Sequence, residues 1–247
     1  MIKLFRKIRQ NLIMENKTAN YLKYAIGEIV LVVIGILIAL QINNWNTNRI
    51  NTIEEGKIIR NLNSEFKLNK TNLNTEILRT EQSINTGKLI MGLIDADEKV
   101  LNTKNTDSIL YKVFEYGGLK ASENSILEIL QSGKFQNLTN DELKSLIIEW
   151  TQKKNEVQRT QELANRNSED LIRYLYKRYP LKNIDAFGIL NWKEKSKLKI
   201  DKYLIFKDIE FENLIDDLLY KLENFKDALI SLQAVIDAII IESQKTK

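Results

Sequence analysis

Residues 24–42 read YAIGEIVLVVIGILIALQI, and this run decides the organisation of the whole chain. At a helical rise of about 1.5 Å per residue, its nineteen residues extend about 28 Å, close to the roughly 30 Å thickness of a bilayer's hydrocarbon core. The part from Ile29 to Leu40 contains no polar side chain. Helices of water-soluble proteins rarely continue so far without a polar face. The run therefore predicts a transmembrane helix, and the alternative is a buried core helix of a globular domain.

Aromatic side chains bracket this run, with Tyr21 and Tyr24 before its apolar part and Trp45 after it. Tryptophan and tyrosine concentrate at the two membrane–water interfaces, where an amphipathic ring meets both apolar tails and polar headgroups. We therefore expect residues 21–45 to form the transmembrane helix. More than twenty residues precede the apolar part and no clean small-residue cleavage site follows it, so we interpret it as an uncleaved signal anchor.

Basic residues are distributed unequally on the two sides of the predicted span. Only Arg49, Lys57 and Arg60 lie within about twenty residues after it. Segments rich in lysine and arginine stay in the cytoplasm. The asymmetry predicts an inner (cytoplasmic) membrane protein with a cytoplasmic N-terminus and an extracytoplasmic C-terminal domain. The basic residues before the span are Lys3, Arg6, Lys7, Arg9, Lys17 and Lys23.

Residues 1–20 form a basic amphipathic segment, and their spacing predicts a helix that lies flat in the cytoplasmic membrane interface. One face of this helix is apolar and the other is mostly basic. Such a helix directs its cations toward anionic headgroups and buries its apolar side chains at the edge of the acyl chains. The alternative is a plain basic stretch that only sets the orientation of the span. The residues expected at the membrane interface are Lys3, Phe5, Arg6, Lys7, Ile8 and Arg9, together with Tyr21, Tyr24 and Trp45.

A stripe of small and polar residues runs along one side of the predicted span. It comprises Glu28, Val32, Gly35 and Ala39, whose spacing of four, three and four places them on one helical face. Carboxylates inside a bilayer are costly and indicate a functional role, and the pair Gly35 and Ala39 allows a second helix to approach closely. We therefore predict a helix-packing face for a protein partner or a second copy of the chain. The alternative is that Glu28 only reaches back to the headgroups and that the small residues have no role.

Composition excludes several classes of enzyme. The chain has 247 residues, one proline and nine glycines, and it contains neither cysteine nor histidine. These absences exclude hydrolases built on a Ser-His or Cys-His pair, histidine or thiolate metal sites, and disulfides. Carboxylate chemistry remains open, but no acidic group stands above the scattered background. No catalytic residue, metal ligand or cofactor is predicted.

The net charge of +4 is a local feature of the N-terminal segment. Residues 1–23 carry six cations against Glu15, a net charge of +5, so the remainder of the chain sums to −1. A nucleic-acid-binding domain would need a basic surface of its own. No nucleic-acid partner is expected.

Residues 46–247 are expected to form one antiparallel helical bundle, which makes the fold class all-α. So few prolines and glycines leave little room for the many turns of a β-sandwich or barrel. The clearest element is the last helix, where apolar residues alternate at four- and three-residue spacings. Further apolar residues widen this stripe, which indicates contact with more than one neighbouring helix. The repeat comprises Phe211, Ile215, Leu218, Leu222, Phe225, Leu229, Leu232, Ile236 and Ile239.

An earlier apolar stripe, from Ile59 to Ile84, is interrupted by Asn69 and Thr80. The interruptions favour a bundle helix over an uninterrupted coiled coil.

Local signals delimit another helix. Thr139 and Glu142 match a capping box, which predicts a helix start, and Pro180 predicts its end. Residues 181–207 are interpreted as an irregular connection packed on the bundle, with a short strand at KYLIFK as the alternative.

Residues 8–46 read IRQNLIMENKTANYLKYAIGEIVLVVIGILIALQINNWN. This segment resembles the opening of a family of uncharacterised bacterial single-pass membrane proteins, a domain of unknown function, and the resemblance is strongest over residues 1–50. Residues 125–143, SILEILQSGKFQNLTNDEL, also resemble that family. The resemblance implies a membrane-anchored helical domain and carries no activity, cofactor or catalytic residue.

These patterns favour a membrane-anchored, non-enzymatic helical module that is an accessory or scaffold subunit, or a partner-binding module, of a cell-envelope complex. The expected partners are the lipid bilayer and either another protein or a second copy of the chain through the membrane helix. The alternatives are a ligand-sensing extracytoplasmic domain and an enzyme that uses carboxylates.

Overall fold

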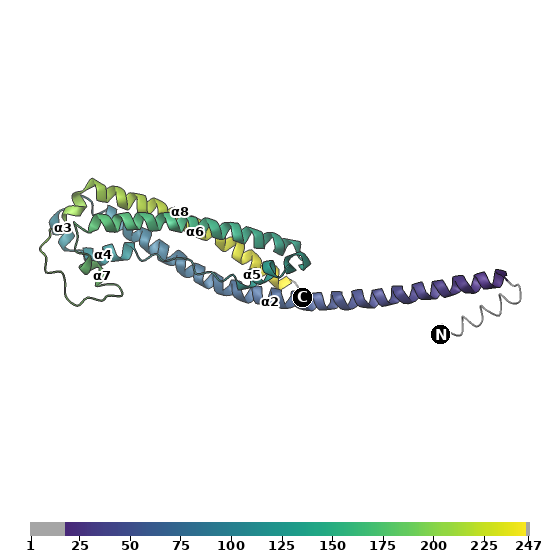
Figure 1. The fold of residues 1–247 in the computed structure, drawn as a ribbon. Coiled ribbons are helices and arrows are strands. Elements are labelled where there is room, and N and C mark those ends of the chain that lie inside the picture. The colour runs from purple at the N-terminus through teal and green to yellow at the C-terminus, as the bar shows by residue number, and fades with distance from the viewer. Residues whose placement is uncertain (1–17, 246–247) are drawn as a thin grey trace. The chain divides into compact units, whose positions relative to one another are not determined.

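The computed structural model describes residues 18–245, and all regular structure within this range is helical. The predicted all-α class is confirmed. The chain divides into two compact units, residues 1–56 and residues 57–247. The helices in Figure 1 are α2 (Thr18–Met91), α3 (Glu98–Asn102), α4 (Thr106–Val113), α5 (Asn124–Gln131), α6 (Asp141–Leu175), α7 (Leu181–Asp185) and α8 (Ile209–Lys245), with 3-10 helices η1 (Lys134–Asn137) and η2 (Leu204–Lys207).

In the first unit, residues 18–56 all belong to α2. The large apolar side chains from Ile29 to Leu40 are between 45% and 63% exposed, so no other part of residues 18–245 covers them. The alternative of a buried core helix is therefore wrong for this segment. Within the described range, α2 is the one helix long and apolar enough to cross a membrane. Its helical conformation continues past residue 45 to Met91.

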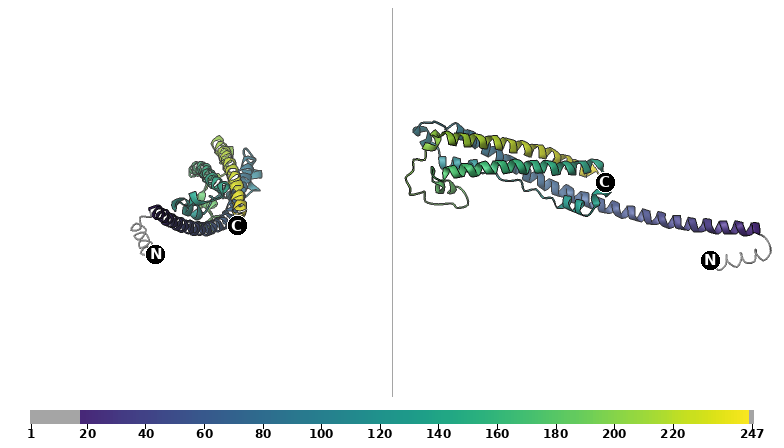
Figure 2. Two further views of the ribbon diagram at one scale, coloured as in Figure 1. Left: turned by 90° about the vertical axis from the view of Figure 1, so that its right-hand side faces the viewer. Right: turned by 45° about the horizontal axis from the view of Figure 1, so that its top comes forward.

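The second unit is a bundle of three long helices: the part of α2 from Lys57 onward, α6 and α8 (Figure 2). Asn63 of α2 contacts Ser243 of α8, whereas Lys88 contacts Glu223, so these two helices are antiparallel. Cross-helix contacts give α6 and α8 the same antiparallel relation. α6 is therefore parallel to α2, and the chain must return along the bundle between α4 and α6.

The core of the bundle lies between these three helices. All nine residues of the apolar repeat predicted in α8 are 0% exposed, which confirms that α8 is a central helix. The other two helices also contact each other in the core: Phe66 of α2 and Trp150 of α6 meet edge to face with their ring centroids 4.9 Å apart. Burying a large apolar side chain contributes about 1.5–3 kcal/mol, so the apolar repeat of α8 contributes substantially to the stability of the bundle.

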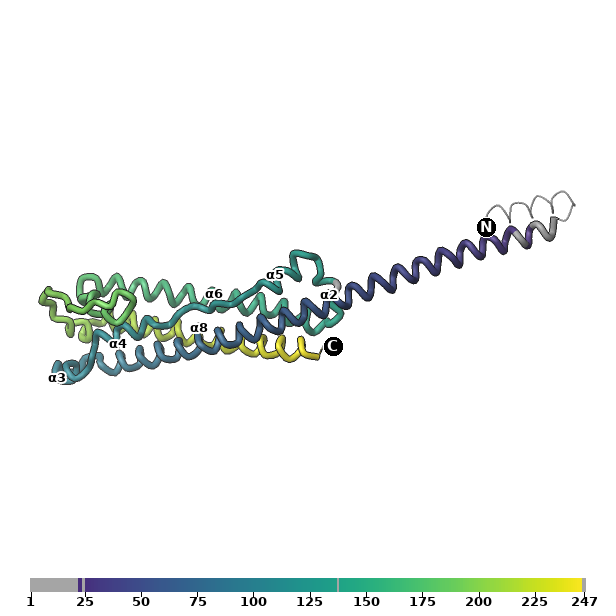
Figure 3. The backbone as a smooth tube through the Cα atoms, turned by 90° about the horizontal axis from the view of Figure 1, so that it is seen from below, coloured from purple at the N-terminus to yellow at the C-terminus, as the bar shows by residue number. Residues whose placement is uncertain are grey.

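The chain returns along the bundle as an extended segment, residues 115–123, which we call the strap (Figure 3). Polar side chains of α2 bind the main chain of the strap. Asn69 donates to the Ser122 carbonyl at 2.9 Å and accepts the Ser122 N–H at 2.8 Å, and Glu76 accepts the Gly117 N–H at 2.8 Å. These side chains supply hydrogen bonds that a partly buried main chain requires and that no neighbouring strand provides. Asn69, the polar residue that interrupts the apolar stripe of α2, therefore holds the strap against the bundle.

The strap leads into α5, whose first turn is capped from outside by Glu65 of α2. The Glu65 carboxylate accepts the N–H groups of Asn124 and Ser125, each at 2.7 Å, and the hydroxyl of Ser122. A negative charge at a helix N-terminus also interacts favourably with the helix dipole. Burial raises the pKa of Glu65, but the hydrogen bonds from these three residues together outweigh burial and hold the pKa below its ordinary value.

The ends of α6 differ from the predicted ones. Its N-cap is Asn140, whose side chain accepts the Leu143 N–H at 2.9 Å, so the prediction of a cap at Thr139 is wrong by one residue. Asparagine and threonine are both good N-cap residues, so the local sequence pattern does not show which of the neighbours Thr139 and Asn140 caps the helix. At the other end α6 stops at Leu175, and Pro180 directly precedes α7.

The connection from α7 to α8 contains no strand: KYLIFK includes the 3-10 helix η2. Ile184 of α7, and Ile205 and Phe206 of η2, are buried, so both ends of residues 181–207 pack on the bundle as predicted. Between these ends Tyr203 is partly buried against the core, whereas several large apolar side chains are exposed.

Candidate functional site

Residues 187–204, which we call the basic loop, project from the end of the bundle that carries α3, α4 and α7 (Figure 1). Large apolar side chains that would normally be buried are exposed along this loop, up to 103% at Ile189. Isolated exposed apolar residues are ordinary, but a contiguous group of them marks an interaction surface. The exposed apolar residues of the loop are Phe187, Ile189, Leu190, Trp192, Leu198, Ile200 and Leu204.

Cations are interleaved with these apolar side chains. Five lysines against Glu194 and Asp201 give the basic loop a net charge of +3. Lys193, Lys197 and Lys199 form no ion pair with any residue from 18 to 245. The loop therefore combines uncovered apolar surface with unneutralised positive charge.

A buried carboxylate, Asp107, fixes the loop to the bundle. Asp107 lies in the first turn of α4 and its side chain is 2% exposed. Lys202 donates to its Oδ1 at 3.1 Å and Lys195 donates to its Oδ2 at 3.2 Å. The Tyr179 hydroxyl also donates to Oδ1, at 2.6 Å, and is 2.9 Å from the Thr106 hydroxyl. We call Asp107 with Lys195, Lys202 and Tyr179 the latch.

The electrostatics of the latch favour the ionised form of the Asp107 carboxylate. Burial raises the pKa of Asp107, but the Tyr179 hydrogen bond and the two lysines outweigh burial and hold the pKa below its ordinary value. The pKa of Tyr179 is raised, first by burial and then by its hydrogen bond to Asp107. Both Asp107 oxygens are occupied by donors. This arrangement suits structural anchoring rather than proton transfer to a substrate.

Further contacts hold the loop at other points. The Asn183 side chain accepts the Ser196 N–H at 2.8 Å, and the Tyr203 hydroxyl donates to Asn102 at 2.7 Å. The Lys182 ammonium lies 5.4 Å from the centroid of the Trp192 ring. The loop is thus tied to α3, α4 and α7 while its apolar side chains face solvent.

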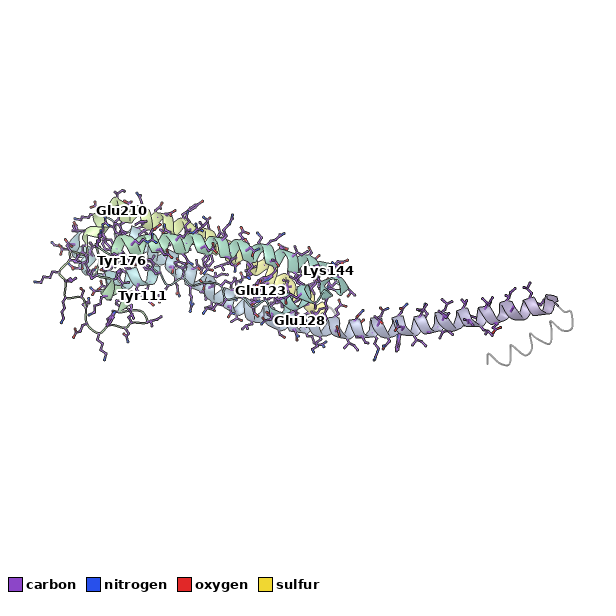
Figure 4. All side chains as sticks on the ribbon, viewed as in Figure 1. Tyr111, Glu123, Glu128, Lys144, Tyr176 and Glu210 are labelled. Atoms are coloured by element: carbon purple, nitrogen blue, oxygen red, sulfur yellow. The ribbon has the colours of Figure 1, made fainter. Side chains whose placement is uncertain are left out.

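A groove of about 320 Å³ adjoins the loop where it enters η2. Its apolar lining residues include Ile200 and Leu204, and its polar ones include Tyr174 and Arg178 of the segment that ends α6, together with Lys177, Asp201 and Asp208. Figure 4 shows Tyr111, Tyr176 and Glu210 at this end of the bundle, whereas Glu123, Glu128 and Lys144 lie toward the opposite end. The groove and the loop therefore occupy the same end of the second unit.

The predicted packing stripe lies in the first unit, on one face of α2. Val32, Gly35 and Ala39 are exposed and Glu28 is half-buried. A Cβ atom added to Gly35 would have no heavy atom within 4 Å, so the described chain itself does not require glycine there. The packing role of the stripe remains a prediction.

The residues predicted at the membrane interface fall into three groups. Trp45 is 67% exposed, and the Arg49 guanidinium lies 5.9 Å from its ring centroid, an arrangement suited to an interfacial anchor. Tyr21 and Tyr24 belong to α2. The remaining positions lie outside the described residues: Lys3, Phe5, Arg6, Lys7, Ile8 and Arg9.

Sequence reasoning did not identify the latch or the loop as a site. One signal was available, because residues 187–204 contain seven large apolar residues without the periodicity of an element that could bury them. Asp107 carried no such signal, since its partners are distant in sequence. No protein-family model, curated protein or solved structure matches the chain.

Proposed function

We propose that this chain is a membrane-anchored, non-enzymatic module that binds a protein partner through the basic loop. The observation that carries the proposal is the exposure of seven large apolar side chains on a loop fixed by a buried latch. Holding an interface in place before binding reduces the ordering entropy that association costs. A fixed apolar surface with cations around it is the composition expected of a docking site.

The membrane anchor in this proposal is the apolar segment of α2. The basic residues before this segment favour an inner-membrane location with a cytoplasmic N-terminus and an extracytoplasmic bundle. The resemblance of residues 8–46 to bacterial single-pass membrane proteins supports the same topology. Such a module would serve as an accessory or scaffold subunit of a cell-envelope complex.

Photo-cross-linking in cells tests this function. The full chain carries a photo-reactive residue at Ile189 or, as a control, at Leu78, which is 59% exposed on α2. We expect a distinct protein adduct from position 189 only, and stoichiometric co-purification of that protein in mild detergent, measured by light scattering and mass spectrometry. A chain that purifies alone and gives identical adducts from both positions would contradict the proposal.

Self-association through the membrane helix is the second candidate, favoured by the stripe of Glu28, Val32, Gly35 and Ala39, of which the last three are exposed. In Gly35→Ile the larger side chain would prevent two helices from approaching closely at this position. We therefore expect this variant to be a monomer in detergent where the original chain is an oligomer, as measured by light scattering. Gly27→Ile is the matched control, because a Cβ atom there is equally uncrowded but lies off the stripe. An oligomer that survives Gly35→Ile combined with Glu28→Gln would exclude this packing face.

A further inference from the structure

We infer that the partner of the basic loop is an acidic protein segment that inserts an apolar side chain into the groove beside the loop. The inference rests on the proposed function, and it specifies the chemistry of the partner. It is carried by the groove, by the exposed apolar residues of the basic loop, and by the cations of that loop that form no ion pair within residues 18–245.

The groove has a rigid polar wall. The Arg178 guanidinium stacks 4.1 Å from the centroid of the Tyr174 ring, and the Tyr174 hydroxyl donates to Asp208 at 2.7 Å. Arg178 also pairs with Asp208 at 3.6 Å and with Glu210 at 3.1 Å. Tyr174, Arg178 and Asp208 therefore all have partners within the bundle. These three groups stay paired when an apolar side chain packs against the wall.

The remainder of the lining includes three apolar residues. Ile200 is 41% exposed, Leu204 is 63% exposed, and Ile205 is buried. A volume of about 320 Å³ lies at the lower end of ligand pockets and accommodates one large side chain. Protein interfaces typically obtain most of their affinity from one or a few such anchors seated in pockets.

The charge around the groove selects an acidic partner. The groove lining itself contains Lys177 and Arg178 against Asp201 and Asp208, so its formal charges sum to zero. The excess positive charge comes from Lys193, Lys197 and Lys199 of the loop. Carboxylates of the partner would therefore flank the anchor side chain rather than enter the groove, and would meet these lysines at the rim, where charges accelerate and orient association.

The geometry favours a protein over an anionic membrane surface. A fluid bilayer adapts to any convex apolar loop and needs no pocket. Here the loop is fixed by the latch, and its apolar residues continue into a concave groove with a rigid wall. Such a groove is complementary to a defined side chain.

Selection of peptides on the full chain in mild detergent tests the inference. A displayed library of short random peptides is the probe, and enriched peptides are expected to carry a large apolar residue flanked by aspartate or glutamate. Affinity for an enriched peptide is expected to fall at least about tenfold, the equivalent of about 1.4 kcal/mol, in Leu204→Glu and in a Lys193→Glu, Lys197→Glu, Lys199→Glu triple variant. Leu78→Glu is the control and should bind as the unsubstituted chain does. Circular dichroism verifies that each variant is folded.

Two outcomes would overturn the inference. If enriched peptides bind Leu204→Glu and the triple variant with unchanged affinity, the partner does not insert an apolar side chain flanked by carboxylates. If a protein adduct still forms at Ile189 in that case, the proposed function stands and only the inference about the partner fails. In a second arm, the full chain in zwitterionic nanodiscs is mixed with vesicles containing anionic lipid. We expect that the nanodiscs do not co-float with the vesicles. If they do, and if the triple variant abolishes this co-flotation, the loop binds a lipid surface instead.

Discussion

Replacing Asp107 by asparagine is expected to lower the free energy of unfolding of the helical bundle by about 3 kcal/mol. The asparagine carbonyl oxygen can still accept the hydrogen bonds made to one oxygen of Asp107, but the NH₂ group that replaces the other oxygen faces a lysine, which is also a donor. Lys202 is only 24% exposed, so its charge would remain partly desolvated without a counter-ion. Lys195 is 75% exposed and is readily solvated, which limits the total cost.

The effect of Asp107 should depend on pH in a defined direction. Its pKa is lowered in the folded state, so its contribution is fully present above the unfolded pKa of roughly 3.9 and is lost as pH falls through the folded value. The difference in free energy between the original chain and Asp107→Asn should therefore be constant from about pH 5 to 8 and shrink below about pH 4. Other carboxylates titrate in the same range, but they cancel in this difference.

Chemical denaturation of the full chain in detergent, followed by circular dichroism, measures this prediction. Asp185→Asn is the control, because Asp185 is an exposed carboxylate at the same end of the bundle, and we expect it to change stability by less than about 0.5 kcal/mol. Hydrogen exchange should accelerate in residues 190–203 of Asp107→Asn. If Asp107→Asn and Asp185→Asn were equally stable, the latch would not stabilise the bundle.

Replacing Asn69 by leucine is expected to destabilise the bundle by about 2 kcal/mol, although leucine would complete the apolar stripe of α2. Asn69 is 0% exposed and its side chain satisfies both the N–H and the carbonyl of Ser122. Leucine would leave these two main-chain groups without partners, at about 1–3 kcal/mol each, and additional apolar burial offsets only part of that cost.

Asn72→Leu is the matched control for this prediction. Asn72 binds the same strap through a single hydrogen bond to the Lys120 carbonyl at 2.9 Å, but it is only half-buried. Water can replace that bond, so we expect a cost below about 1 kcal/mol. Both free energies come from denaturation of the full chain in detergent. If Asn69→Leu were as stable as the original chain, the strap would not depend on this side chain.

Local sequence signals located several elements and misplaced others by a few residues. The interruption at Asn69 was visible as a break in an apolar stripe, but its role required the position of Ser122, 53 residues away. The cap of α6 fell one residue from the prediction, since Thr139 and Asn140 are both suitable caps. The path of residues 187–204 was beyond local reasoning, because no periodic element contains them.

The apolar segment of α2 and the central position of α8 could be predicted from the sequence, because both depend on the spacing of apolar residues close together in the chain. Which polar residues are buried with partners, and which apolar residues remain exposed, depends on the tertiary structure. Asp107 meets Tyr179 across 72 residues and Lys202 across 95, and no pattern in the sequence pairs residues at such separations. The candidate site is a product of those long-range contacts: they fix the basic loop at the end of the bundle and leave its apolar side chains uncovered.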